Sequence, residues 1–161
     1  MAKNQSAGVL LYRRHKGELE VFLVHPGGPY WRGKDNGAWT IPKGKISEGE
    51  RPFEAAKREF HEETGSEAKG HFQELTPLKQ PSGKVIYVWA VEGEIDSAAL
   101  KSNTFEMEWP PRSGIQREFP EIDDGRWYPF QAAYVKLLPG QRGFLDQLKR
   151  LLGLDNAASQ S

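Results

Sequence analysis

Residues 44–65 of the chain read GKISEGERPFEAAKREFHEETG, and this stretch decides the fold. Its second half predicts a helix over residues 52–64, because Pro52 suits a first-turn position and Gly65 stands where a C-terminal glycine cap belongs. The apolar residues of this helix recur at i, i+3 and i+7, the spacing of a narrow buried stripe. They are Phe53, Ala56 and Phe60.

Three glutamates lie beside that stripe. At about 100° per residue, Glu59, Glu62 and Glu63 fall within an arc roughly 100° wide. Carboxylates this close repel one another, and a bound divalent cation such as Mg²⁺, which prefers carboxylate oxygens, would remove the repulsion. Charged helix faces are also commonly just solvated. The i, i+4 pairs of Arg58 with Glu54 and with Glu62 would support a helix by themselves, so both interpretations stay open here.

The spacing of charged residues and glycines over residues 44–66 matches the Nudix box, G-x5-E-x7-R-E-U-x-E-E-x-G-U, where U is an aliphatic residue. The chain fills all seven fixed positions: Gly44, Glu50, Arg58, Glu59, Glu62, Glu63 and Gly65. At roughly 6–7% usage per residue type, a chance match is on the order of 10⁻⁸ per starting point. The chain therefore resembles the Nudix hydrolases. It departs from the pattern at Phe60, which replaces a smaller aliphatic residue but should still pack inward, and at Ser66, the last apolar position.

The resemblance implies an α/β fold, a Nudix-type α/β/α sandwich with a central mixed β-sheet. We expect a single domain over residues 1–154 and a disordered C-terminal tail over 155–161, since 161 residues suit one domain of roughly 150. The segment 96–119 reads as irregular. Periodicity and turn residues predict the remaining elements independently. They are strands over 8–12, 19–25, 38–41, 67–79, 84–94 and 125–128, and helices over 52–64, 130–138 and 141–152.

Charge and composition limit the partners. The chain carries 22 Lys and Arg against 22 Asp and Glu, which disfavours a polybasic nucleic-acid or membrane binder, so we expect no membrane and no stable nucleic-acid partner. It has no cysteine, which excludes disulfides, Cys-ligated zinc and a thiol nucleophile, and fits a cytoplasmic location. The longest apolar run, residues 85–91, is too short for a spanning helix.

For function, the resemblance implies a hydrolase that cleaves the pyrophosphate linkage of a nucleotide polyphosphate with Mg²⁺ or Mn²⁺. Arg58 would orient a carboxylate, Glu50 would support the loop or a water on the metal, and Gly44 would let the backbone approach metal or phosphate. The expected metal ligands are Glu59, Glu62, Glu63 and Glu121. The expected catalytic residues are Glu59, Glu62, Arg58 and Glu121.

Glu121 lies outside the box. Family members often take a further ligand or general base from such a loop, and Glu121 precedes Arg126-Trp127 in the E-x4-R-W pattern of some relatives. Asp123 and Asp124 compete for this role, and an ordinary acidic turn is the alternative.

The expected substrate-binding residues are Lys43, Gly44, Lys45, Arg13 and Tyr87. Tyr30, Trp31 and Trp109 are further candidates for stacking on a base, with core packing or loop support as the alternative. The segment 102–119 reads either as a lid that brings Arg112 to phosphate or as a dimer contact through Trp109.

The lead-in over residues 39–44, WTIPKG, and the spacing of Glu121 resemble asymmetric diadenosine tetraphosphate hydrolases and related nucleoside triphosphate pyrophosphohydrolases. The partner is then a small nucleotide, and the chain a monomer or homodimer. Alternatives are an enzyme for ADP-ribose or diphosphoinositol phosphates and a non-catalytic nucleotide- or RNA-binding module of the same fold. A structural acidic helix with adventitious Ca²⁺ is disfavoured because no calcium-type Asp/Asn/Gly loop is present.

We predict that Glu121→Gln lowers turnover strongly while leaving the protein folded, because the amide removes the charge but keeps the shape of the side chain. Steady-state hydrolysis and circular dichroism of the variant check this. Unchanged turnover would show that Glu121 is only a turn residue.

Overall fold

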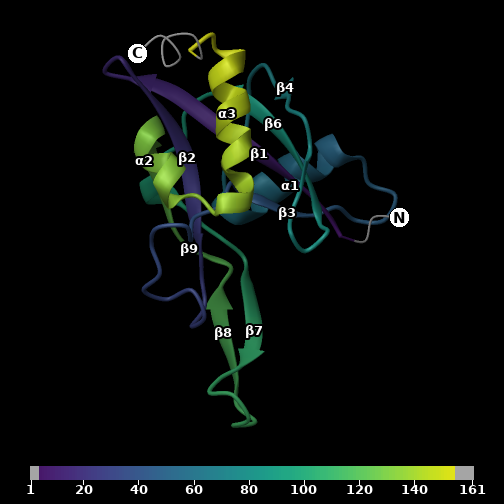
Figure 1. Ribbon diagram of the computed structural model, residues 1–161. Helices are drawn as coiled ribbons and strands as arrows, with labels where there is room; N and C mark the ends of the chain where they lie inside the picture. Colours follow the sequence, from purple (N-terminus) through teal and green to yellow (C-terminus); the bar gives the residue numbers. More distant parts are fainter. Residues whose placement is uncertain (1–3, 155–161) are drawn as a thin grey trace.

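A computed structural model of the chain describes residues 4–154 (Figure 1). Its centre is a seven-stranded sheet in which β1 pairs in parallel with β6 and antiparallel with β2. Five of the strands are hydrogen-bonded in the order β4-β6-β1-β2-β9. In addition, β3 pairs with β1, and β5 pairs with β6. The strands are β1 (Gln5–His15), β2 (Glu18–Pro26), β3 (Lys43–Lys45), β4 (Gln73–Glu74), β5 (Leu78–Lys79), β6 (Val85–Glu92) and β9 (Ile122–Pro129). The predicted tail, 155–161, lies outside the described residues.

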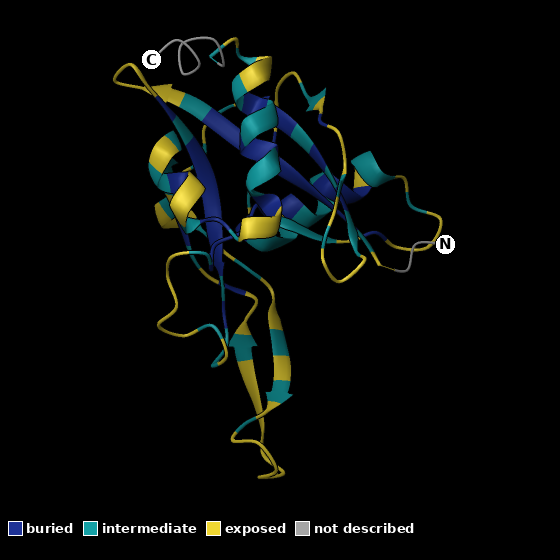
Figure 2. Ribbon diagram, in the orientation of Figure 1, coloured by how far each residue is buried: buried dark blue, intermediate teal, exposed yellow. Residues whose placement is uncertain are grey.

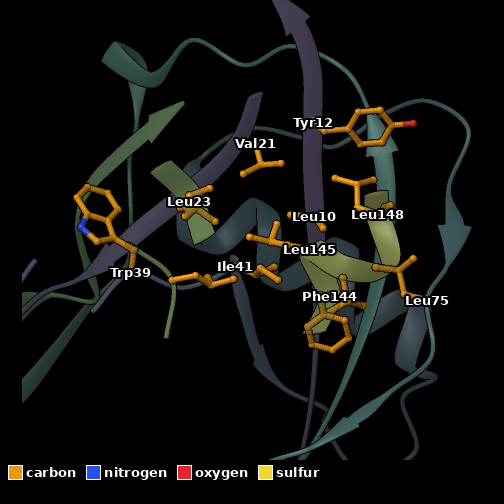
Figure 3. Packing of buried hydrophobic residues seen from close by; sticks show 14 of the residues in the cluster. Leu10, Tyr12, Val21, Leu23, Trp39, Ile41, Leu75, Phe144, Leu145 and Leu148 are labelled. Carbon is orange, nitrogen blue, oxygen red and sulfur yellow. The ribbon is translucent and has the colours of Figure 1, made fainter. Parts of the chain in front are cut away.

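Helices cover both faces of the sheet, which confirms the α/β/α sandwich. On one face lie α2 (Phe130–Lys136) and α3 (Arg142–Leu151), linked by the 3₁₀ turn η2 (Pro139–Gln141), and on the other lies α1 (Pro52–Thr64) (Figure 1). Alternation along β1 supplies both cores, because successive side chains point to opposite faces. Leu10 packs with Leu145 and Leu148 of α3, as Figure 3 shows, whereas Leu11 packs in the cluster that contains Phe60 of α1.

The helix α1 begins and ends as its sequence predicts. Pro52 occupies the first turn, and Gly65 caps the end at φ 77°, donating its N–H to the carbonyl of His61 at 2.7 Å. Of the predicted stripe, Ala56 and Phe60 are fully buried, while Phe53 is half-buried against Phe72 and Trp89.

Two predicted strands are much reduced. Residues 38–41 make only isolated bridges, of Thr40 with Val24 and Trp39 with Leu137, so they form no strand of their own. The predicted strand 67–79 survives only as the dipeptides β4 and β5, since Gly70, at φ 134°, and Pro77, which lacks an N–H, interrupt it.

The prediction that residues 96–119 are irregular was wrong over much of its length. After the 3₁₀ turn η1 (Ser97–Ala99), the strands β7 (Thr104–Glu108) and β8 (Gln116–Pro120) form an antiparallel hairpin. It projects from the sheet and is largely exposed (Figures 1 and 2). The alternation in TFEME was the signal for β7. Within residues 4–154, no helix combines the length and apolarity that crossing a membrane requires.

We predict that Phe60→Ala lowers the free energy of unfolding by about 3–5 kcal/mol, because it empties a fully buried site between α1 and the sheet. Phe60→Leu, which restores the more usual aliphatic type, should cost less than about 2 kcal/mol. Urea denaturation followed by circular dichroism measures both. Equal costs would mean that the volume of Phe60 is not what anchors α1.

Candidate active site

The guanidinium of Arg58 joins the loop before α1 to the glutamates on that helix. It grips Glu50 with two donors, Nε to Oε2 at 2.8 Å and Nη2 to Oε1 at 3.0 Å. Nη2 also donates to the carbonyl of Lys45 at 3.0 Å, while Nη1 donates to Glu59 at 2.8 Å and to Glu62 at 3.0 Å. All five N–H donors of the side chain are therefore used.

Glu50 closes the loop that carries the box toward the helix. Its carboxylate accepts the main-chain N–H of Ser47 at 3.0 Å, and its own N–H donates to the carbonyl of Ser47 at 3.0 Å. The hydrogen bonds from Arg58, helped by that of Ser47, hold the pKa of Glu50 at about 2, well below its ordinary value. Of the two roles expected for Glu50, these contacts favour support of the loop.

Gly44 leaves room for the carboxylate of Glu59. A Cβ at Gly44 would overlap that carboxylate where it now accepts from Arg58, so a larger residue would displace the Glu59 side chain. Gly44 pairs with Ala7 of β1, which locks β3 to the sheet. The expected approach of the Gly44 backbone to a metal or phosphate stays a prediction.

Glu63 lies deeper than the other glutamates, and its carboxylate accepts the main-chain N–H of Lys43 at 3.1 Å. Burial raises the pKa of Glu63 to about 8; the charges of Glu59 and Glu121 add to this, and the charge and N–H of Lys43 oppose it. Burial also raises the pKa of Glu59, against the hydrogen bond from Arg58. Burial is thus the main cause that raises the pKa of both Glu59 and Glu63, and the charges of neighbouring carboxylates raise both further.

Glu121 is held by its main chain rather than by its side chain. Its N–H donates to the carbonyl of Asn103 at 2.8 Å, and its carbonyl accepts the N–H of Gly27 at 2.9 Å. The two competing acids are engaged elsewhere: Asp123 pairs with His25 at 2.8 Å, and Asp124 pairs with Arg126 at 2.9 Å. Glu121, in contrast, lines a cleft together with Glu63.

This acidic cleft, about 440 Å³ in volume, has aromatic walls. The rings of Tyr30 and Trp31 meet edge to face at 5.2 Å, and the Lys34 ammonium lies 3.8 Å from the centre of the Tyr30 ring. On the hairpin side, the ring of Phe105 packs so closely on Gly28 that a Cβ there would touch it. The lining consists of Pro26, Gly27, Gly28, Tyr30, Trp31, Glu63, Phe105, Met107 and Glu121.

Phe105 and Met107 were missed as candidate site residues. Their signal was the apolar alternation of β7, a segment predicted to be irregular. Tyr30 is 66% exposed, so core packing does not explain its ring, while its contacts with Trp31 and Lys34 leave loop support open.

The structure does not bring Arg13 to the acidic cleft. It pairs with Glu20 at 2.8 Å and with Glu94 at 2.9 Å, and it covers the ring of Trp127 at 4.1 Å. Along β1 it lies six residues from Ala7, the partner of Gly44, which is roughly 20 Å at the usual strand rise.

Tyr87 is also apart from the cleft. It lines a separate groove of about 330 Å³ with Phe53 and Trp89, and its hydroxyl accepts the Nε2 hydrogen of Gln5 at 3.2 Å. Lys45 is exposed and contributes its carbonyl to Arg58. His61 is exposed on α1.

Carboxylate oxygens are the ligands that Mg²⁺ and Mn²⁺ prefer, so the donor set of this region fits a hard divalent cation. A cation would also favour the charged form of Glu63, whose pKa is raised first by burial and further by the charges of Glu59 and Glu121. Across residues 4–154, no three His, Asp or Glu side chains are already gathered closely enough to hold a metal ion. In this arrangement Glu59 and Glu62 share one nitrogen of Arg58, so an ion would compete with Arg58 for them.

The model of the NUDIX domain matches residues 2–148, and the chain therefore belongs to this family. It is 29% identical over 100 residues to the asymmetrical bis(5'-nucleosyl)-tetraphosphatase of Mus musculus, covering 55% of this chain and 64% of the relative. It is 28% identical over 132 residues to an 8-oxo-(d)GTP phosphatase of Mycolicibacterium smegmatis, covering 74% of this chain but only 38% of the relative. The chain thus spans less than two thirds of the length of both.

Among solved structures, a binary complex of an Ap4A hydrolase from C. elegans superposes with a TM-score of 0.64 at 19% identity, covering 92% of this chain and 98% of that one. This likeness confirms the fold.

We predict that Glu50→Gln lowers the free energy of unfolding by about 1–3 kcal/mol at neutral pH, because it breaks the two-donor pair with Arg58. The folded-state pKa of about 2 lies below the ordinary value of 4.5, so this stabilisation is complete above about pH 4.5 and is lost as the pH falls toward 2. The difference between wild type and variant should shrink over that window in urea melts. Glu48→Gln, on an exposed residue of the same loop, is the matched control. A difference independent of pH would contradict the pairing.

Proposed function

We propose that the chain is a divalent-metal-dependent hydrolase that cleaves the pyrophosphate linkage of nucleotide polyphosphates, of the dinucleoside polyphosphate or nucleoside triphosphate type. The observation that carries the proposal is that Arg58 organises Glu59 and Glu62 of α1, while Glu63 of the same helix lines a cleft with both acidic and aromatic walls. The carboxylates would hold a divalent cation that offsets the charge of a phosphate chain, and the aromatic walls suit a nucleobase.

In this proposal Glu59, Glu62, Glu63 and Glu121 hold Mg²⁺ or Mn²⁺, which supplies neutralisation of the charge that develops on the phosphates. Arg58 is the residue that keeps Glu59 and Glu62 oriented, since one of its nitrogens donates to both. Glu50 in turn keeps Arg58 in place through two hydrogen bonds.

The chain's own acid–base group is Glu121. A water oxygen forms a bond to phosphorus, the bond from that phosphorus to the bridging oxygen breaks, and Glu121 takes the proton that the water loses. What supports this role is its exposure in the cleft and its fixed main chain, with both the N–H and the carbonyl hydrogen-bonded to flanking segments.

Substrate binding follows from the same cleft. Tyr30, Trp31 and Phe105 hold a nucleobase by stacking, and Lys43, beside Glu63, contacts the phosphates. The names of the two relatives support nucleotide polyphosphates as the class of substrate. We further propose that residues 1–154 form one domain that acts in the cytoplasm, as a monomer or homodimer, without a membrane or stable nucleic-acid partner.

We predict that Glu62→Gln lowers kcat by roughly 10²-fold or more, the size of effect expected when one contact to transition-state charge is lost. The assay measures phosphate-product release with Mg²⁺ or Mn²⁺. Its panel contains diadenosine polyphosphates, canonical and oxidised nucleoside triphosphates, ADP-ribose and diphosphoinositol phosphates. Removal of the ion with EDTA should abolish turnover.

Glu54→Gln, on an exposed glutamate of the same helix that pairs with Lys57, is the matched control and should leave turnover unchanged. If the folded wild-type protein bound metal but turned over nothing in the panel, the non-catalytic nucleotide- or RNA-binding module would replace this proposal.

A further inference from the structure

The projecting hairpin has two chemically different faces. Cross-strand pairing places Phe105 opposite Phe119 and Met107 opposite Arg117. The pairing continues one position beyond the ends of β7 and β8, where the N–H of Trp109 donates to the carbonyl of Ile115 at 2.9 Å. Since side chains at every second position share a face of a strand, these six residues form one face, which we call the aromatic face.

The opposite face is acidic. Glu106 lies opposite Glu118, and Glu108 lies opposite Gln116. The aromatic face, by contrast, carries Arg117 as its charged residue, between the Phe105–Phe119 pair and the Trp109–Ile115 pair. A polyanion approaching the hairpin is therefore attracted to the aromatic face and repelled from the other.

The aromatic face is continuous with the acidic cleft. Phe105 and Met107 line the cleft that also holds Glu63 and Glu121. Trp109 lies four residues beyond Phe105, which is roughly 13 Å further out at the usual strand rise. Trp109 is half-buried and Ile115 is 51% exposed, so the outer part of this face remains accessible.

The hairpin is braced at both ends. Two-stranded hairpins are marginal alone, but here the N–H of Ile122 donates to the Ser102 hydroxyl at 3.0 Å at the root. At the turn, Glu108 accepts the N–H of Gly114 at 2.6 Å. The face is thus ordered before a ligand arrives, which lowers the cost of binding on it.

We propose that the aromatic face is an outer subsite for a second nucleoside, the one attached to the far end of the polyphosphate chain. Trp109, with Met107 beside it, would stack on the second base, and Arg117 would contact phosphate between the two bases. The inference rests on the proposed function and deepens it. The preferred substrate carries a nucleoside at both ends of the polyphosphate, as in a dinucleoside polyphosphate.

The test compares kcat/KM for a dinucleoside tetraphosphate with kcat/KM for the nucleoside triphosphate of the same base. Trp109→Ala should lower this ratio about tenfold, the size expected when one base loses its aromatic stacking partner. Trp109→Phe, which keeps an aromatic ring, should restore most of the ratio. Glu106→Gln, on the acidic face, is the matched control and should leave the ratio unchanged.

Circular dichroism verifies that each variant folds. If Trp109→Ala does not fold, Arg117→Gln replaces it, because Arg117 is exposed, and the ratio should again fall.

Wild-type activity on both substrates with an unchanged ratio in the folded variants would overturn the outer subsite and leave the hydrolase standing. No wild-type activity on either would overturn the hydrolase, and the subsite with it. Loss of a dimer in sedimentation, with the ratio unchanged, would assign the face to a contact between two copies and overturn the proposal.

Discussion

The pair of Arg58 with Glu50 is the interaction on which the rest of the site depends. Two hydrogen bonds hold the guanidinium to a carboxylate of the preceding loop, and the remaining donors reach Glu59, Glu62 and the carbonyl of Lys45. The positive charge of the Arg58 guanidinium thus offsets the repulsion among neighbouring carboxylates, and its hydrogen bonds link the loop to α1. Because all its donors are satisfied, Arg58 has one preferred orientation. Its hydrogen bonds in turn orient the carboxylates of Glu59 and Glu62.

Core packing supplies the second constraint, since it sets the rotation of α1 about its axis. Phe60 and Ala56 are fully buried against the sheet, so the flank that carries Glu59 and Glu63 faces β3. Gly44 then completes the fit, because a larger residue would collide with the carboxylate of Glu59. The packing of the core and the positions of the carboxylates therefore depend on the same part of α1. A shift of Glu59 would disturb its contact with Arg58 or with β3.

The walls of the cleft come from two segments outside the box. Gly27 and Gly28 approach the hairpin root closely, one through a hydrogen bond to the carbonyl of Glu121 and the other through contact with Phe105. These approaches bring Tyr30 and Trp31 opposite the hairpin. In the proposed function, the box supplies the carboxylates that would hold a cation beside phosphate, and these segments supply the surfaces that would contact the nucleobase.

The sequence alone determined the helix of residues 52–64, its glycine cap, the inward-facing Phe60 and the shared arc of its glutamates, because helix periodicity and capping depend on residues within a few turns. It also indicated the longer strands and the C-terminal helices. It offered Tyr30 and Trp31 as candidates for stacking on a base, but it did not reveal the hairpin β7–β8, the separation of Arg13 from the cleft, or the place of Phe105 and Met107 in the cleft walls. Only the tertiary structure decided these, because they depend on strand register, on position along a strand and on contacts between segments far apart in the chain.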